Sequence, residues 1–305
     1  YASGYTTLFN TIGFITETHM LKPYKDRVES TLAFLHVMNK YVADNSEDLM
    51  ETRRKAFEYD RRADDFAINW AMDSSIYEER KFKGFEYSYP TSKVSGSQRL
   101  KYDEGKPKSF DIKYYNTWRA TDNVSIPEYY VVPRAWREVV YRLQLNGVQM
   151  VPISQDTTIH VGSYYIRDPQ FLNYPYEGHF LLKSMTVEMR VQQRNFLKGD
   201  YLVATNQKNI RFIVSVLEPK AVDSYLRWNF YDEIFQQKEH FSPYVFEETA
   251  EQLLAENAEL RGAFEEWKSE NPDQLNNSYP ALKFIYQQSE YYEKEHLRYP
   301  VARIE

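Results

Sequence analysis

A strict alternation of apolar and polar residues runs from Met185 to Gln192 and constrains the fold more than any other feature. Successive side chains of a strand point to opposite faces of its sheet, so this pattern predicts a strand with one face in water. Shorter aromatic-rich runs at 66–70, 85–89 and 110–114 are also β-prone, and proline and glycine separate them. We therefore expect a chain with a large β-sheet content.

The N-terminal segment predicts a buried strand followed by a helix. Residues 12–16 form a short apolar, β-prone run of the kind that fills a buried strand. After Pro23, apolar residues recur at helical spacing, which predicts an amphipathic helix packed on a sheet. The stripe consists of Val28, Leu32, Leu35 and Met38. A strand and a helix cannot form a domain alone, so we expect their partners to precede Tyr1, outside this chain.

Helices are also predicted further along the chain. Pro133 opens a helix with an apolar stripe, and Asn146-Gly147 ends it. Beyond about residue 209 the sequence becomes helical, whereas 279–305 is Tyr-rich and is expected to be mostly irregular. The helical candidates are 223–235 and a pair of helices between 246 and 267.

Composition limits the partners of the chain. The net charge is −6 and no basic run is present, which argues against nucleic acid as the main partner. There is no cysteine, so disulfides and thiolate metal sites are excluded. No apolar stretch approaches the roughly 20 residues that span a bilayer. The chain starts at Tyr1 without an initiator methionine or a signal peptide, so we expect a mature or truncated product.

Few residues carry a signal for chemistry. The six histidines are scattered and none begins a His-x-x-Glu or His-Glu-x-x-His pattern, so we expect no zinc site made from this chain alone. Glu17 follows the apolar run, at the strand end where α/β sheets assemble ligand sites. It is either a general base or a structural strand-end residue. His179 and Glu177 form either a second site or a structural turn.

The segment from Tyr1 to Val28 resembles the end of the catalytic domain of M14 zinc carboxypeptidases. Its Glu17–Tyr24 run (ETHMLKPY) is similar to a subgroup of large secreted M14 proteins from Bacteroidetes-type bacteria. Motifs of the rest of the chain resemble the C-terminal extension of that subgroup. They are Pro133–Trp136, Tyr176–His179, Lys198–Tyr201, Leu217–Pro219, Trp228–Asp232 and Arg298–Val301.

The resemblance implies a zinc-dependent peptide hydrolase in which Glu17 is the catalytic base. In the family, a His-x-x-Glu pair and a later His hold one zinc ion, which polarises the scissile carbonyl while the glutamate takes a proton from water. Family members also use a mobile tyrosine on the loop before this strand. Tyr1 and Tyr5 lie in that loop, and the role is assigned to Tyr1. All three metal ligands would lie upstream of this chain, so we expect the chain alone to be inactive.

The expected fold class is α/β plus α+β. Residues 1–45 would be the last strand and helix of a carboxypeptidase-type domain, 46–220 a β-rich mixed accessory domain, and 221–305 a helical region. The expected partners are a peptide substrate and the rest of the M14 domain, in a periplasmic or secreted protein. The alternative is a non-catalytic peptide- or glycan-binding or assembly module on a degenerate peptidase scaffold, which the 27 tyrosines also favour.

Overall fold

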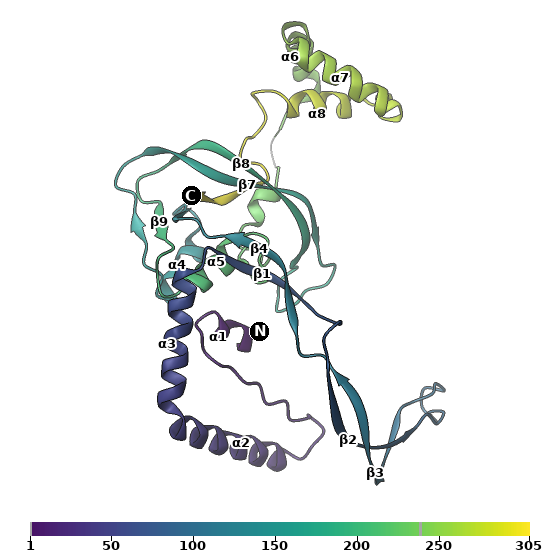
Figure 1. Ribbon diagram of the computed structural model, residues 1–305. Coiled ribbons are helices and arrows are strands. Elements are labelled where there is room, and N and C mark those ends of the chain that lie inside the picture. The colour runs from purple at the N-terminus through teal and green to yellow at the C-terminus, as the bar shows by residue number, and fades with distance from the viewer. Residues whose placement is uncertain (1, 238–239) are drawn as a thin grey trace. The chain divides into compact units, whose positions relative to one another are not determined.

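The computed structural model describes residues 2–237 and 240–305, as a mixed α/β chain with several sheets (Figure 1). Contacts divide the chain into two compact units. One unit joins the residues up to Arg61 with residues 127–305, and the other consists of residues 62–126. The division at 45 and 220 expected from the sequence stays a prediction.

The first unit contains a six-stranded sheet with the order β6-β9-β5-β10-β7-β8. All neighbouring strands pair antiparallel. The alternating stretch 185–192 lies in β8, so the strand predicted there is confirmed. The strands are β5 (Tyr129–Val132), β6 (Val151–Pro152), β7 (Thr157–Phe171), β8 (Leu182–Phe196), β9 (Tyr201–Ala204) and β10 (Arg298–Ile304).

The core of this unit lies between the sheet and two short helices. Val131, Val161 and Ala302 of the sheet are buried, each at most 1% exposed. The helix predicted after Pro133 is confirmed as α4 (Arg137–Leu145), and α5 (Ile210–Leu217) is apolar on nearly all sides. The Tyr299 hydroxyl of β10 donates to the Leu217 carbonyl at 2.8 Å, which ties α5 to the middle of the sheet.

A buried polar network joins the sheet to the end of α5. The Glu218 carboxylate accepts hydrogen bonds from the Tyr130 hydroxyl at 2.7 Å and from the Tyr164 hydroxyl at 2.9 Å. Arg303 forms an ion pair with the same carboxylate at 2.9 Å, and both side chains are 2% exposed. Since a buried charge is tolerated only when it is paired and hydrogen-bonded, these four side chains fix the register between β5, β7 and β10.

The N-terminal segment differs from the expectation. The strand predicted at 12–16 is not present among the described residues, because 11–19 form neither helix nor strand. No described strand lies alongside the segment, and a strand cannot form without a neighbour to accept its backbone hydrogen bonds. The helix predicted after Pro23 is confirmed as α2 (Tyr24–Asp44), but none of its residues is buried. The remaining helices here are α1 (Ala2–Thr7) and α3 (Ser46–Arg62).

Three helices near the C-terminus have a core of their own. The predicted helical pair is confirmed as α6 (Pro243–Glu256) and α7 (Ala258–Glu270). The expectation of an irregular stretch at 279–305 is wrong, because α8 (Ser278–Gln287) packs on α6 and β10 joins the main sheet. The helix expected at 223–235 is wrong too, since only a 3₁₀ turn forms at Asp232–Phe235. The shared core contains Phe246, Ala250, Leu260, Leu282, Ile285 and Tyr286.

The second unit is built from two-stranded sheets. Strand β1 (Asp65–Met72) pairs with β4 (Trp118–Ser125), and β2 (Glu78–Ser88) pairs with β3 (Lys101–Tyr114). Throughout 62–126, all of which is described, the buried residues are Phe66 and Ile68. The strands expected at 66–70, 85–89 and 110–114 are confirmed except for Tyr89, which lies just past β2. None of the helices described in either unit has the length and apolar character needed to cross a bilayer.

Candidate functional sites

Glu17 lies on an exposed, irregular segment. Residues 11–19 have no regular structure, and the side chains of Ile12, Phe14 and Ile15 are 69%, 59% and 56% exposed. Phe14 contacts Phe34 of α2 edge to face, with ring centroids 5.8 Å apart. The structure therefore places Glu17 in solvent beside α2.

The two tyrosines considered for the mobile-tyrosine role differ in their placement. Tyr1 lies outside the described residues. Tyr5 lies in α1, where it is half exposed, and its hydroxyl donates to Oδ1 of Asn146 at 2.5 Å. Its ring also contacts Phe9, with centroids 5.2 Å apart. Tyr5 thus ties α1 to the end of α4.

The described residues do not fit a zinc ion. Nowhere in 2–237 or 240–305 do three His, Asp or Glu side chains gather closely enough to hold a metal. His179 packs against aromatic rings, with its centroid 5.6 Å from that of Trp228 and 6.4 Å from that of Phe230. Glu177 is exposed in the same turn, with a positive φ of 48°. No ion pair or hydrogen bond joins these two described side chains, which favours a structural turn.

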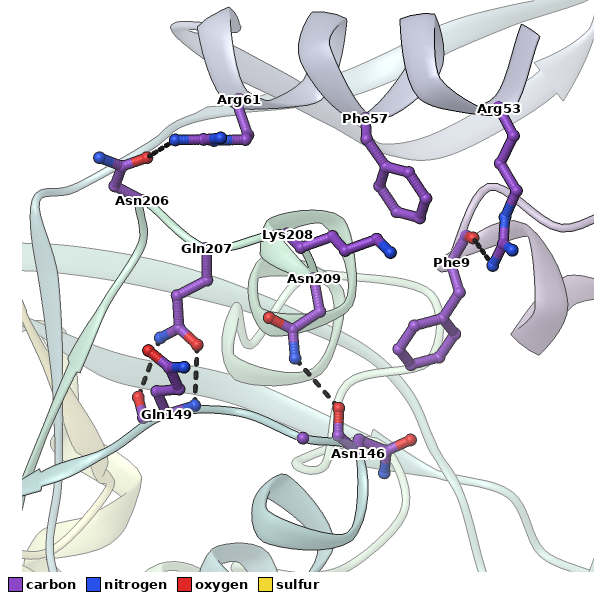
Figure 2. A pocket seen from close by; sticks show the side chains of 11 residues that line it. Phe9, Arg53, Phe57, Arg61, Asn146, Gln149, Asn206, Gln207, Lys208 and Asn209 are labelled. Carbon is purple, nitrogen blue, oxygen red and sulfur yellow. Dashed lines mark hydrogen bonds between the residues drawn. The ribbon is translucent and has the colours of Figure 1, made fainter. Parts of the chain in front are cut away.

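A cavity of about 480 Å³ lies between α3, the residues after α4 and the residues after β9 (Figure 2). This volume is in the range of small-molecule sites. The lining combines cationic, amide and phenyl side chains. Its residues are Arg53, Arg61 and Lys208; Asn146, Gln149, Asn206, Gln207 and Asn209; Phe9 and Phe57; and Gly147.

One face of α3 forms a wall of this cavity. Arg53, Phe57 and Arg61 are spaced four residues apart, so they project from the same side of the helix. Figure 2 shows Phe57 directed from the helix toward Lys208, Arg61 toward Asn206 and Arg53 toward Phe9. The Lys208 Nζ lies 4.5 Å from the centroid of the Phe57 ring, a distance typical of a cation–π contact.

The opposite wall is held rigid by amide hydrogen bonds. Gln207 is buried, and its Oε1 accepts from the Gln149 backbone N–H at 2.8 Å. Its Nε2 donates to the carbonyls of Gln149 and Ala204 at 2.9 and 2.7 Å. Asn209 Nδ2 donates to the Asn146 carbonyl at 3.0 Å. Because both the oxygen and the nitrogen of the Gln207 side-chain amide form hydrogen bonds, this wall keeps its shape without a ligand.

The charges around the cavity are unbalanced. Among the described residues, its lining includes three cations and no carboxylate. The neighbouring Arg54 is neutralised by ion pairs with Glu51 and Glu58, of which Glu58 borders an adjoining hollow. The hydrogen bond from Arg54 lowers the pKa of Glu51 to about 2. By contrast, neither Arg53, Arg61 nor Lys208 forms an ion pair with any described residue.

Sequence reasoning missed this cavity. Charged residues dominate the stretch 43–64, a pattern that predicts a solvated helix or linker, and most of α3 is indeed exposed. The i, i+4, i+8 spacing of Arg53, Phe57 and Arg61 was the available signal, because it places an aromatic ring between two cations on one helix face. Lys208 and the amides come from distant parts of the chain, and no local pattern marks them.

Comparison with known proteins finds similarity to carboxypeptidases over part of the chain. The chain is 33% identical over 103 residues to carboxypeptidase 2 of Trichophyton tonsurans, covering 33% of this chain and 19% of that protein. Carboxypeptidase 2 of Trichophyton equinum matches to the same extent, and a probable carboxypeptidase 2 of Arthroderma benhamiae is 31% identical over 101 residues. The chain thus matches about a fifth of the length of these curated relatives. No family model and no solved structure matches it. One region of the chain is therefore carboxypeptidase-like in sequence.

Proposed function

We propose that this chain is the C-terminal part of a zinc-dependent, M14-type carboxypeptidase and that Glu17 is its general base. The observation that carries the proposal is the carboxypeptidase-like region, taken together with a glutamate that directly follows an apolar, strand-like run. In the whole protein, residues 12–16 would add a strand to a sheet formed by residues outside this chain. The exposure of Ile12, Phe14 and Ile15 supports this, because such side chains are stable in a core.

In this proposal the chain contributes a carboxylate and not a metal site. The Glu17 carboxylate would accept a proton from the attacking water and pass it to the leaving amine. The described residues do not assemble zinc ligands, so the ligands are proposed to lie in the rest of the whole protein. Segment 11–19 and α2 would order on that domain and thereby position Glu17. The whole protein is proposed to act on peptides in the periplasm or outside the cell.

The test is Glu17→Gln in the whole protein, assayed for release of C-terminal residues from peptides. Loss of a general base lowers kcat by a factor on the order of 10²–10⁴, and the zinc content should stay unchanged. Glu29→Gln is the matched control, because this exposed carboxylate on α2 makes only a surface ion pair with Lys25. Full activity of Glu17→Gln, or an equal loss in the control, would show that Glu17 is not the base.

A second candidate function is a non-catalytic peptide- or glycan-binding module. Exposed tyrosines on the second unit favour it, since Tyr87, Tyr89 and Tyr102 are 53%, 57% and 54% exposed. Aromatic rings of this kind supply rigid contact area for a ligand. A whole protein that binds no zinc and hydrolyses no peptide, yet binds peptide or glycan saturably, would establish this function instead.

A further inference from the structure

The cavity beside α3 has the charge of an anion-binding site. In a chain with a net charge of −6, three cations line one cavity, and the part of the chain that the structure describes adds no carboxylate to its lining. Arg53, Arg61 and Lys208 are all exposed, so a dissolved ligand can reach them. Placing like charges together is unfavourable unless a counter-charge joins them, and no described residue supplies it.

The guanidinium groups are oriented before any ligand arrives. Arg53 Nη2 donates to the Thr11 hydroxyl at 2.9 Å and to the Phe9 carbonyl at 3.3 Å. Arg61 Nη2 donates to Oδ1 of Asn206 at 3.3 Å. A guanidinium carries five N–H donors, so each arginine keeps several for a ligand. Orienting the donors in advance lowers the entropy cost of binding.

Two phenyl rings give the cavity an apolar surface that the non-ionic part of a ligand can contact. Phe9 is fixed by stacking on Phe212, with centroids 5.2 Å apart and an interplanar angle of 27°. Phe57 is flanked by Arg53, whose guanidinium carbon lies 5.3 Å from the ring centroid, and by Lys208. A molecule bound between these walls would meet cations and phenyl carbons side by side.

We propose that this cavity binds a small organic oxyanion, with a carboxylate or phosphate group attached to an apolar body. The oxyanion accepts hydrogen bonds from Arg53, Arg61 and Lys208, and its apolar body packs on Phe9 and Phe57. The site is separate from Glu17 and does not depend on hydrolysis. Its test is therefore a binding measurement on the 305-residue chain, which can succeed or fail independently of the proposed peptidase function.

The experiment is calorimetric titration with phenyl phosphate, benzoate and the neutral benzyl alcohol, in low salt. The test variant is Arg53→Gln/Lys208→Gln. The control is Lys40→Gln/Lys55→Gln, which removes the same charge from exposed lysines of α2 and α3 that do not line the cavity. Since a hydrogen bond to a charged group contributes about tenfold in affinity, we expect at least tenfold weaker oxyanion binding in the test variant only.

The proposal holds if an oxyanion binds saturably, benzyl alcohol binds far more weakly, and only the test variant loses affinity. The oxyanion that binds with the higher affinity then identifies the ligand class. A phosphate ligand would also gain affinity as the pH rises through about 6, where its second proton leaves, whereas benzoate would not. The proposal is overturned if no oxyanion binds at millimolar concentration, if the alcohol binds equally well, or if both variants lose the same affinity.

Discussion

Asp60 is the only buried residue of α3, a helix described along its whole length. Its side chain is 2% exposed, and its two carboxylate oxygens accept from Arg211 of α5 at 2.5 and 3.2 Å. Asn10 Nδ2 donates to the same carboxylate at 2.8 Å. One acidic side chain therefore joins α3, α5 and the residues after α1, and it sets the position of the wall that carries Arg53 and Arg61.

Replacing Asp60 with Asn should destabilise the protein. Removing the carboxylate charge breaks a buried ion pair, and with Arg211 partly exposed we expect a loss of about 3 kcal/mol. Chemical denaturation of both forms measures the difference. Asp48→Asn, at an exposed position of the same helix, should change stability by less than about 0.5 kcal/mol. Equal effects of the two substitutions would contradict the role of Asp60.

Single residues of interest can be identified from the sequence more readily than the pairs of residues that contact each other in the fold. Glu17 is noticeable because it follows an apolar run, yet its catalytic role stays a prediction. The pairing of Asp60 with Arg211, 151 residues away, leaves no trace in local pattern. Long-range partners of this kind depend on how the elements pack, and neither spacing nor composition encodes that directly.

Helix α2 shows what happens when an amphipathic element lacks a partner. Its stripe residues Val28, Leu32 and Leu35 are 44%, 50% and 51% exposed. The helical spacing and the Pro23 start suffice to predict the helix, since these signals are local. They also predict a sheet beneath it, and none of the described strands takes that place.

Replacing the leucines of this stripe with smaller side chains should therefore have little effect on the stability of the 305-residue chain. Leu32→Ala/Leu35→Ala is expected to change the free energy of unfolding by less than about 0.5 kcal/mol. Leu143→Ala, at a fully buried position of α4, should cost about 2–5 kcal/mol and serves as the reference. In the whole protein, where the proposed domain covers the stripe, the same two substitutions should be strongly destabilising. A large loss in the short chain would show that α2 is already packed.

Strand β10 is the opposite case, because its segment was expected to be irregular and is instead a central strand of the sheet. It lies inside the sheet between β5 and β7. Pro300 lacks a backbone N–H and is unusual inside a sheet, and the β7 register is irregular between Arg298 and Ala302. Its partners are more than 100 residues away in sequence, so only the folded sheet reveals the strand.

At the scale of the whole molecule, the two units differ in how they are stabilised. The first has a six-stranded sheet with buried strands, whereas nearly all of β2 and β3 is exposed in the second. A two-stranded ribbon is only marginally stable in water without further packing. The ribbon is predictable from its β-prone runs, but its lack of a core is not, because aromatic residues ordinarily indicate burial.

Hydrogen exchange should separate the units. Backbone amides in β2 and β3 are expected to exchange at least about tenfold faster than those in β7 and β10, because sparse packing lowers the free energy of local opening. Exchange followed by mass spectrometry at several protein concentrations measures this. Slow exchange in the ribbon at every concentration would contradict the prediction. Protection that appears only at high concentration would show that the ribbon associates with another copy.

The ends of the second unit meet each other. Asp65 pairs with Ser125 in the β1–β4 ladder, and the Ile126 N–H donates to the Asp64 carbonyl at 3.0 Å. The chain therefore departs and returns through neighbouring positions, as an insertion does. Residues 62–126 could therefore be lengthened, exchanged or deleted, in evolution or by design. A short turn would then connect the two ends of the first unit, and the order of the strands in its sheet would stay the same.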